Sequence, residues 1–186
     1  TMVLADMGAD VIKVERPNGG DDQRRMGPPF IKDWSAGFLA LNRNKRSLVV
    51  DLRSESGQAM FKRLVEGADV VVENFRPDVK NRLGIDYKSL KAINPGIILA
   101  SISGFGQDGP YANRPGFDQI AQGMGGLMSI TGQPGAGPMR VGIPIADLSA
   151  GLYCALGIMV ALLERETSGQ GQWVQSSLLA AQISML

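Results

Sequence analysis

The 186-residue sequence contains no histidine and a single cysteine, Cys154. The missing histidine removes the commonest general base and metal ligand, and one cysteine cannot form an internal disulfide framework. Nineteen Lys and Arg residues nearly balance eighteen Asp and Glu residues, so the formal charge of +1 provides no general attraction to nucleic acid or anionic lipid. Any chemistry must use carboxylates, amines, hydroxyls or the one thiol, and no metal site is expected.

Long apolar runs are also scarce. The longest, Gly151 to Leu163, is shorter than the roughly 20 residues that cross a bilayer, and no charged-then-apolar leader precedes the first element. With its lone cysteine, the chain is expected to be cytoplasmic, without a membrane or nucleic-acid partner. Helical patterns at Thr1–Met7 and Ser177–Leu186 lack an opening cap and a closing turn respectively, which predicts a longer natural chain.

Apolar periodicity divides the chain into alternating strands and helices. Continuous apolar runs such as Val70-Val71-Val72 are typical of parallel strands that are covered by helices on both faces. We therefore expect one α/β domain with a Rossmann-like parallel sheet, and loops at Pro17–Asp33 and Gly104–Gly116. The predicted strands are Val11–Glu15, Leu48–Leu52, Val70–Glu73, Ile97–Ser103 and Trp173–Gln175, and the predicted helices are Ser54–Glu66, Val79–Ile93 and Asp147–Arg165.

The loop after the fourth predicted strand has the spacing of a dinucleotide fingerprint, with glycines at 104, 106 and 109. That fingerprint requires a helix that starts at the loop, so that the helix N-terminus meets the pyrophosphate. Pro110 and Pro115 follow instead, and Asp118 comes too soon to bind the ribose. We therefore favour a glycine loop beside an active site over NAD or FAD binding.

Asp147 is the strongest candidate for chemistry, because it lies between the apolar segment Val141–Ala146 and a long predicted helix. An aspartate in this place can be the N-cap of the helix, a nucleophile, or both at once. Cys154, with no histidine to activate it, is interpreted as a small buried residue. The helix residues expected to face the core are Leu148, Leu152, Leu156, Met159, Val160 and Leu163.

Six short blocks share one order and spacing with a known family: Val11–Pro17, Asn44–Ser47, Val72–Pro77, Asn94-Pro95, Gly104–Pro110 and Ala146-Asp147. Together they resemble the family III CoA-transferases, the group of formyl-CoA transferase and of CaiB- and BaiF-like proteins. The resemblance covers almost the whole chain and implies that residues 1–186 form part of the family's large, Rossmann-like domain, without its first strand and the small domain. It also implies an interlocked homodimer, acyl-CoA and carboxylic acids as substrates, and no permanently bound cofactor.

The resemblance places the family's catalytic aspartate on Asp147. It implies that this carboxylate attacks the donor thioester to form an anhydride, which the CoA thiolate converts into an aspartyl-CoA thioester before the acceptor acid takes over. Among the CoA-contacting positions, arginines would meet phosphates, and Arg16, Arg53, Asn74 and Arg82 are expected to converge on one groove. The CoA-contacting positions fall on Arg16, Val50, Asp51, Leu52, Arg53, Asn74, Phe75, Arg76, Arg82, Leu83, Pro115, Gly116, Phe117 and Asp118.

Two alternatives stay open. The α-methylacyl-CoA racemases resemble the chain through the same aspartate, but they use a histidine in a Gly-His-Asp context, where this sequence has Gly116-Phe117-Asp118. The chain could instead be a non-catalytic CoA-binding or dimer-scaffold fragment, inactive when isolated. The donor and acceptor acids are not identified, although the middle of the chain resembles the dicarboxylate transferases that use succinyl-CoA.

Overall fold

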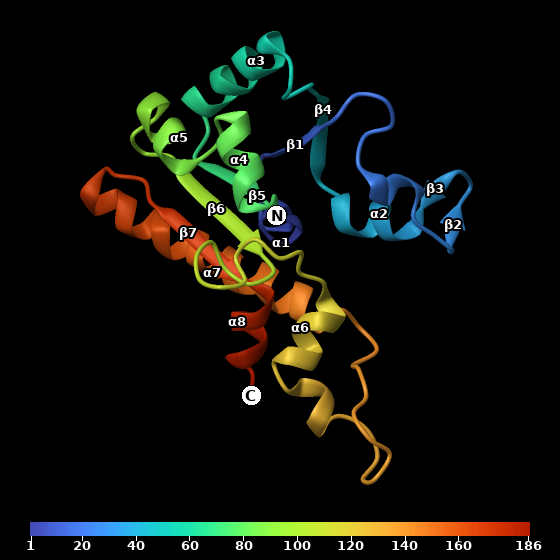
Figure 1. The fold of residues 1–186 in the computed structure, drawn as a ribbon. Helices are drawn as coiled ribbons and strands as arrows, with labels where there is room; N and C mark the ends of the chain where they lie inside the picture. Colours follow the sequence, from blue (N-terminus) through green and yellow to red (C-terminus); the bar gives the residue numbers. More distant parts are fainter. The chain divides into compact units, whose positions relative to one another are not determined.

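The computed structural model describes all 186 residues, which form two compact units, Thr1–Leu64 and Val65–Leu186. Parallel strands occur in both units, as a β1-β4 pair in the first and as a β5-β6-β7 sheet in the second (Figure 1). The predicted α/β class, with parallel strands and flanking helices, is therefore confirmed. That residues 1–186 make up part of a single large domain stays a prediction.

The first unit is built around the parallel pair, with Val11 opposite Lys45 and Glu15 opposite Val49. The strand predicted over Leu48–Leu52 ends at Val49, three residues earlier than predicted. The chain turns there because the Asp51 carboxylate accepts a hydrogen bond from the Arg53 amide (3.0 Å). The elements are α1 (Met2–Asp6), β1 (Val11–Glu15), the 3₁₀ helix η1 (Asp22–Arg25), β2 (Phe30–Ile31), β3 (Trp34–Ser35), α2 (Ala36–Asn42), β4 (Lys45–Val49) and α3 (Glu55–Glu66), which runs across the unit boundary.

The Pro17–Asp33 segment contains η1 and a hairpin strand, and the buried side chain of Glu15 holds it in place. Both carboxylate oxygens bind Arg24, at 2.6 and 2.7 Å, and they also accept from the Asp21 amide (2.9 Å) and the Ser47 hydroxyl (2.8 Å). These bonds, the Arg24 bond foremost, lower the pKa of Glu15 to about 2. The predicted loop is therefore an ordered segment that is tied to the end of β1.

In the second unit, β6 lies between β5 and β7, and its residues Ile98 to Ala100 are fully buried. The single helix predicted over Val79–Ile93 is wrong, because Gly84 ends α4 in the left-handed conformation (φ 66°) and Asp86 caps α5. The elements are β5 (Val70–Glu73), α4 (Pro77–Leu83), α5 (Tyr87–Ile93), β6 (Ile98–Ser103), α6 (Asp118–Met124), the 3₁₀ helix η2 (Leu127–Ile130), α7 (Ile145–Ser168), β7 (Trp173–Ser177) and α8 (Leu178–Ile183).

The long helix α7 packs on β6, β7, α6 and α8 through small residues, among them Ala146, Ala150 and Cys154. The larger apolar residues expected in the core are exposed instead: Leu148, Leu152, Leu156, Met159, Val160 and Leu163. The expectation was wrong because both faces of α7 are apolar, and the narrow face of small side chains lets the helix lie close to the sheet. Cys154 is buried, as predicted.

The length of α7 differs from the expectation that the apolar segment around Gly151–Leu163 is too short to cross a bilayer. The helix extends beyond the apolar run at both ends to 24 residues, long and apolar enough by length and composition to cross a bilayer. A helix with one face packed on a sheet is equally typical of a protein core.

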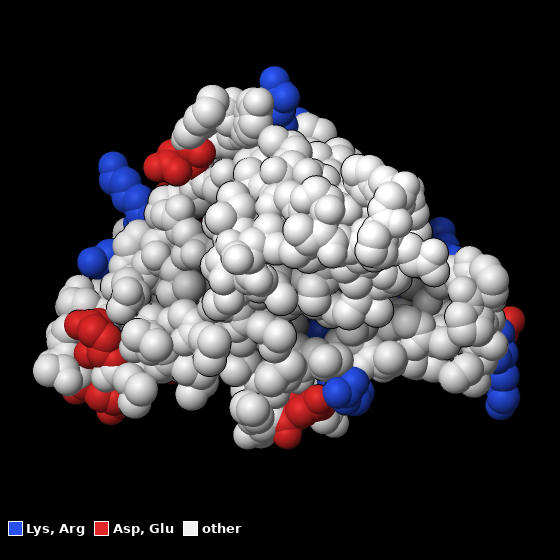
Figure 2. Space-filling model, turned by 90° about the horizontal axis from the view of Figure 1, so that it is seen from below, with Lys and Arg blue, Asp and Glu red and all other residues white.

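Figure 2 shows the face seen from below in Figure 1, where Lys, Arg, Asp and Glu side chains are scattered rather than gathered into a patch.

Candidate functional site

Asp147 lies in the first turn of α7, as the apolar pattern predicted. The helix begins at Ile145 after Pro144, so Asp147 is its third residue and not its N-cap, which corrects the capping interpretation. The cap comes from another helix: Oδ1 of Asp118 accepts hydrogen bonds from the amides of Ala146 (2.8 Å) and Asp147 (3.2 Å). Because Asp118 satisfies the helix end, the Asp147 side chain is free for another role.

The Asp147 carboxylate makes no hydrogen bond and no ion pair within the chain, and the residue is exposed to solvent. Partial removal of water by the surrounding protein atoms raises its pKa, and the nearby negative charge of Asp118 raises it further. A more basic carboxylate is a better nucleophile once it is ionised. The geometry therefore places an unpaired carboxylate with a raised pKa in the first turn of a long helix.

The influence of Asp118 on Asp147 can be measured through the pH profile. Asp118→Asn removes one negative charge and keeps one oxygen for the helix amides, although its amide nitrogen cannot accept the bond that Gln122 on α6 donates to Oδ2. The pKa of Asp147 should therefore fall. The family resemblance implies that Asp147 is a nucleophile, which gains activity as it ionises, so the acid limb of kcat/KM for the implied CoA transfer should move to lower pH. Glu166→Gln, which removes a charge from the opposite end of α7, should leave the limb in place. An unmoved limb in Asp118→Asn would contradict the coupling.

The first unit contributes Arg16 and the segment Val50–Arg53 to the predicted CoA site. Arg16 directly follows β1 and Val50 directly follows β4, so these residues share the carboxyl edge of a parallel pair. Val50 is buried, and its amide donates to the Glu15 carbonyl (2.9 Å). Arg16 binds the Gly20 carbonyl (3.0 Å) and the Asp22 carboxylate, whereas the Arg53 guanidinium makes no ion pair. Arg53 is thus the least engaged cation of this edge.

The second unit places Asn74, Phe75 and Arg76 directly after β5. Asn74 donates to the Ile102 carbonyl (2.7 Å) and Arg76 to the Asn113 carbonyl (3.1 Å), which joins this turn to β6 and to the loop after it. Arg82 pairs with Asp78 (3.3 Å) on the exposed side of α4, and Leu83 ends that helix. The convergence of these residues with Arg16 and Arg53 on one groove stays a prediction.

The glycine loop after β6 runs without a helix until α6 begins at Asp118, which agrees with the rejection of a dinucleotide fingerprint. Its two ends touch: a Cβ atom on Gly104 would lie 2.4 Å from the Cα of Gly116. Only glycine fits at such a close backbone contact. The crossing fixes Gly116 beside the end of β6, while Pro115 and Phe117 on either side of it are exposed.

Sequence reasoning missed a buried cluster at the end of β5. Lys80 on α4 is 3% exposed, and its ammonium lies 3.5 Å from the Glu73 carboxylate and 4.7 Å from the centre of the Trp173 ring. It also donates to the side-chain oxygen of Gln107 in the glycine loop. Glu73 in turn accepts from the Phe75 amide (2.7 Å). No local pattern reveals this cluster, because a lysine in a short helix is usually solvated.

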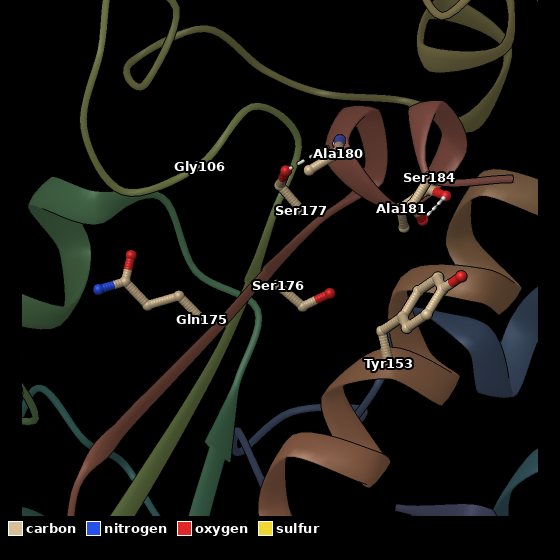
Figure 3. Close-up of a pocket in the computed structure, with 8 residues that line it drawn as sticks. All are labelled: Gly106, Tyr153, Gln175, Ser176, Ser177, Ala180, Ala181 and Ser184. Carbon is tan, nitrogen blue, oxygen red and sulfur yellow. Dashed lines mark hydrogen bonds between the residues drawn. The ribbon is translucent and has the colours of Figure 1, made fainter. Parts of the chain in front are cut away.

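An open pocket of about 300 Å³ lies at the end of β7. Its lining residues come from β7, α7, α8 and the glycine loop (Figure 3). No predicted site residue lines it, and its lining carries no charge. The hydroxyl groups come from Tyr153, Ser176, Ser177 and Ser184. Ser176 and Ser184 already donate to backbone carbonyls. The chain has no group of three or more Asp, Glu or Cys side chains arranged to hold a metal.

The comparisons with known proteins agree with the sequence resemblance. Residues 1–186 match CoA-transferase family III. The succinate–glutarate CoA-transferase of Agrobacterium fabrum is 50% identical over 99% of this chain and 48% of that protein. The succinyl-CoA:glutarate CoA-transferase of Mus musculus is 44% identical over 100% of this chain and 43% of that protein.

A solved structure gives the same result. The crystal structure of a CAIB/BAIF family protein from Brucella suis matches with a TM-score of 0.95 and 48% identity, over 100% of this chain and 50% of that one. This chain spans about half the length of the relatives it matches. On the family match over its full length and these identities, the chain belongs to CoA-transferase family III.

Proposed function

We propose that the protein transfers coenzyme A from an acyl-CoA donor to a carboxylic acid, with Asp147 as the nucleophile. The observation that carries the proposal is the free carboxylate of Asp147, which has a raised pKa and lies on a helix end that Asp118 already caps. Family membership supports the reaction class.

In the proposed mechanism, an Asp147 oxygen attacks the thioester carbon of the donor, the C–S bond breaks, and an acyl-aspartyl anhydride and CoA thiolate result. The thiolate attacks the aspartyl carbonyl, releases the donor acid and leaves an aspartyl-CoA thioester. The acceptor carboxylate displaces the thiolate to form a second anhydride, and the thiolate then attacks the acceptor carbonyl. This last step releases the new acyl-CoA and restores Asp147. Water must be excluded, because hydrolysis competes at every intermediate.

The CoA moiety is proposed to bind at the carboxyl edges of the parallel strands. Arg16, Arg53 and Arg76 would meet its phosphates, since guanidinium groups bind phosphate oxygens in a bidentate manner. Phe75 is 39% exposed, so its ring is available to pack against the adenine. No resident cofactor enters the reaction, and a cytoplasmic homodimer is proposed as the working form.

Dicarboxylic acids are the proposed substrates, because relatives that are 44–50% identical are named for succinate, succinyl-CoA and glutarate. The test incubates the full-length protein with succinyl-CoA and a panel of acids, including glutarate, oxalate and acetate, and identifies products by mass spectrometry. We expect glutaryl-CoA and free succinate in equal amounts. Hydrolysis without any new thioester, or epimerisation of a 2-methylacyl-CoA as in a racemase, would overturn the proposal.

A further inference from the structure

The buried side chain of Gln122 connects the catalytic end of α7 to the segment that precedes it. Gln122 lies on α6 and is 0% exposed. Its amide nitrogen donates to Oδ2 of Asp118 (2.6 Å) and to the Ile143 carbonyl (3.4 Å), while its amide oxygen accepts from the Val141 amide (2.9 Å). Each polar atom of this side chain is therefore satisfied, by α6 itself or by the chain that leads into α7.

Asp118 is held from two sides. Oδ2 binds Gln122, and Oδ1 binds the amides of Ala146 and Asp147. A carboxylate on a side chain has several rotamers, and the bond from Gln122 selects the one in which Oδ1 faces the start of α7. The same glutamine fixes Val141 and Ile143, so the direction in which the chain enters α7 and the cap on α7 depend on one residue.

We propose that Gln122 is a positioning residue, which sets the place of the Asp147 carboxylate by holding both Asp118 and the Val141–Ile143 segment. The inference rests on the proposed function of Asp147. Gln122 does not touch substrate in this role. Its loss should lower the rate of the chemical steps and leave the binding of acyl-CoA nearly unchanged, because a small misplacement of a reacting group reduces kcat.

The chain contains a matched control for this proposal. Gln182 on α8 is also 0% exposed, but neither its amide oxygen nor its amide nitrogen has a hydrogen-bond partner. Gln122→Met and Gln182→Met remove the same amide from equally buried positions. Only the first change leaves polar groups at Asp118 and Val141 without their bonds, so only the first should alter catalysis.

The experiment measures kcat and KM for succinyl-CoA with both variants of the full-length protein, beside Asp147→Asn. We expect Gln122→Met to lose roughly ten- to a hundredfold in kcat with KM within about twofold, and Gln182→Met to match wild type. Equal losses in both glutamine variants, or wild-type kcat in Gln122→Met while Asp147→Asn is inactive, would overturn the role of Gln122 alone. Full activity in Asp147→Asn would instead reject the proposed function.

Gln122→Glu keeps the proposal testable if the methionine variant fails to fold. A protonated Glu can donate to Asp118 and accept from Val141, as the glutamine does, but an ionised Glu repels Asp118. The charged groups near this position are Asp118 on α6, Asp147 on α7 and Arg140, which directly precedes Val141, whereas α8, η2 and the Val141–Ile143 segment carry none. The kcat of Gln122→Glu relative to wild type should fall as pH rises. A ratio that does not change with pH would contradict the role.

Discussion

Asp147→Asn is expected to abolish CoA transfer while the protein stays folded. Asparagine has nearly the same size, but its amide cannot form the anhydride, so kcat should fall by roughly four orders of magnitude. The helix end should survive the change, because Asp118 supplies the cap through the backbone amides of Ala146 and Asp147 and makes no bond to the Asp147 side chain. Transfer is measured with succinyl-CoA and glutarate, and Glu166→Gln on the same helix serves as the active control.

The stability of this variant follows from the raised pKa of Asp147. A carboxyl whose pKa is raised by folding contributes stability that is fully present below its unfolded pKa and is lost as pH rises through the folded pKa. At neutral pH the ionised group therefore adds none, and the thermal midpoint of Asp147→Asn should equal or exceed that of wild type. A lower midpoint would mean that the carboxylate makes a stabilising contact.

The covalent step can be trapped during turnover. Hydroxylamine added to the wild-type protein with succinyl-CoA should convert Asp147 to a hydroxamate, visible as a mass shift on its peptide. The same treatment of Asp147→Asn should leave that peptide unmodified. Retained transfer in the variant, or an adduct on Cys154 instead, would remove Asp147 from the mechanism. Cys154 is a poor nucleophile, because burial raises the pKa of its thiol and so lowers the fraction of thiolate.

The helices and strands with a clear local sequence pattern could be predicted from the sequence. β1 and β5 have the predicted bounds, since each is a short run rich in β-branched residues between polar or glycine-rich segments. The start of α7 near Asp147 was also predictable, because apolar helical periodicity begins there after a proline. Such signals are local, and they do not depend on what the rest of the chain does.

The orientation of α7 could not be predicted, because residues such as Leu156 and Leu163 on one face are as apolar as Ile158 on the other. Periodicity identifies a helix, but it cannot choose between two apolar faces. The sheet takes the face with the smaller side chains, as the fully buried Ala146 and Ala150 illustrate.

The support of the site was missed because it comes from distant residues. Asp118 caps a helix that begins 27 positions later, and capping rules consider only the residues next to a helix end. Gln122 and Lys80 belong to residue types that are mostly exposed, so the sequence predicts them at the surface. Tertiary contacts bury both side chains instead. The family resemblance places Asp118 among the CoA-contacting positions, a role that stays a prediction beside the capping role.

Lys80→Met is expected to destabilise the protein strongly. Methionine keeps the apolar length of the side chain, but it leaves the Glu73 carboxylate buried without the ammonium 3.5 Å away, and Gln107 without its donor. An uncompensated buried charge of this kind costs about 3–5 kcal/mol of unfolding free energy. That is a large part of the free energy of unfolding of a folded protein, which is typically about 5–15 kcal/mol. Urea unfolding measures the loss, with the exposed Lys88→Met as control, expected within about 0.5 kcal/mol of wild type.

The double variant Lys80→Met with Glu73→Gln separates the charge from the shape of this cluster. Glutamine can still accept from the Phe75 amide, as Glu73 does at 2.7 Å, and no buried charge remains. Because replacing both members of a buried ion pair is often nearly neutral, the double variant should recover to within about 1–2 kcal/mol of wild type. If the double variant is no more stable than Lys80→Met, the ammonium acts mainly through Gln107 and the Trp173 ring. If Lys80→Met itself behaves like Lys88→Met, the ion pair contributes nothing to the stability of the edge that carries Asn74, Phe75 and Arg76.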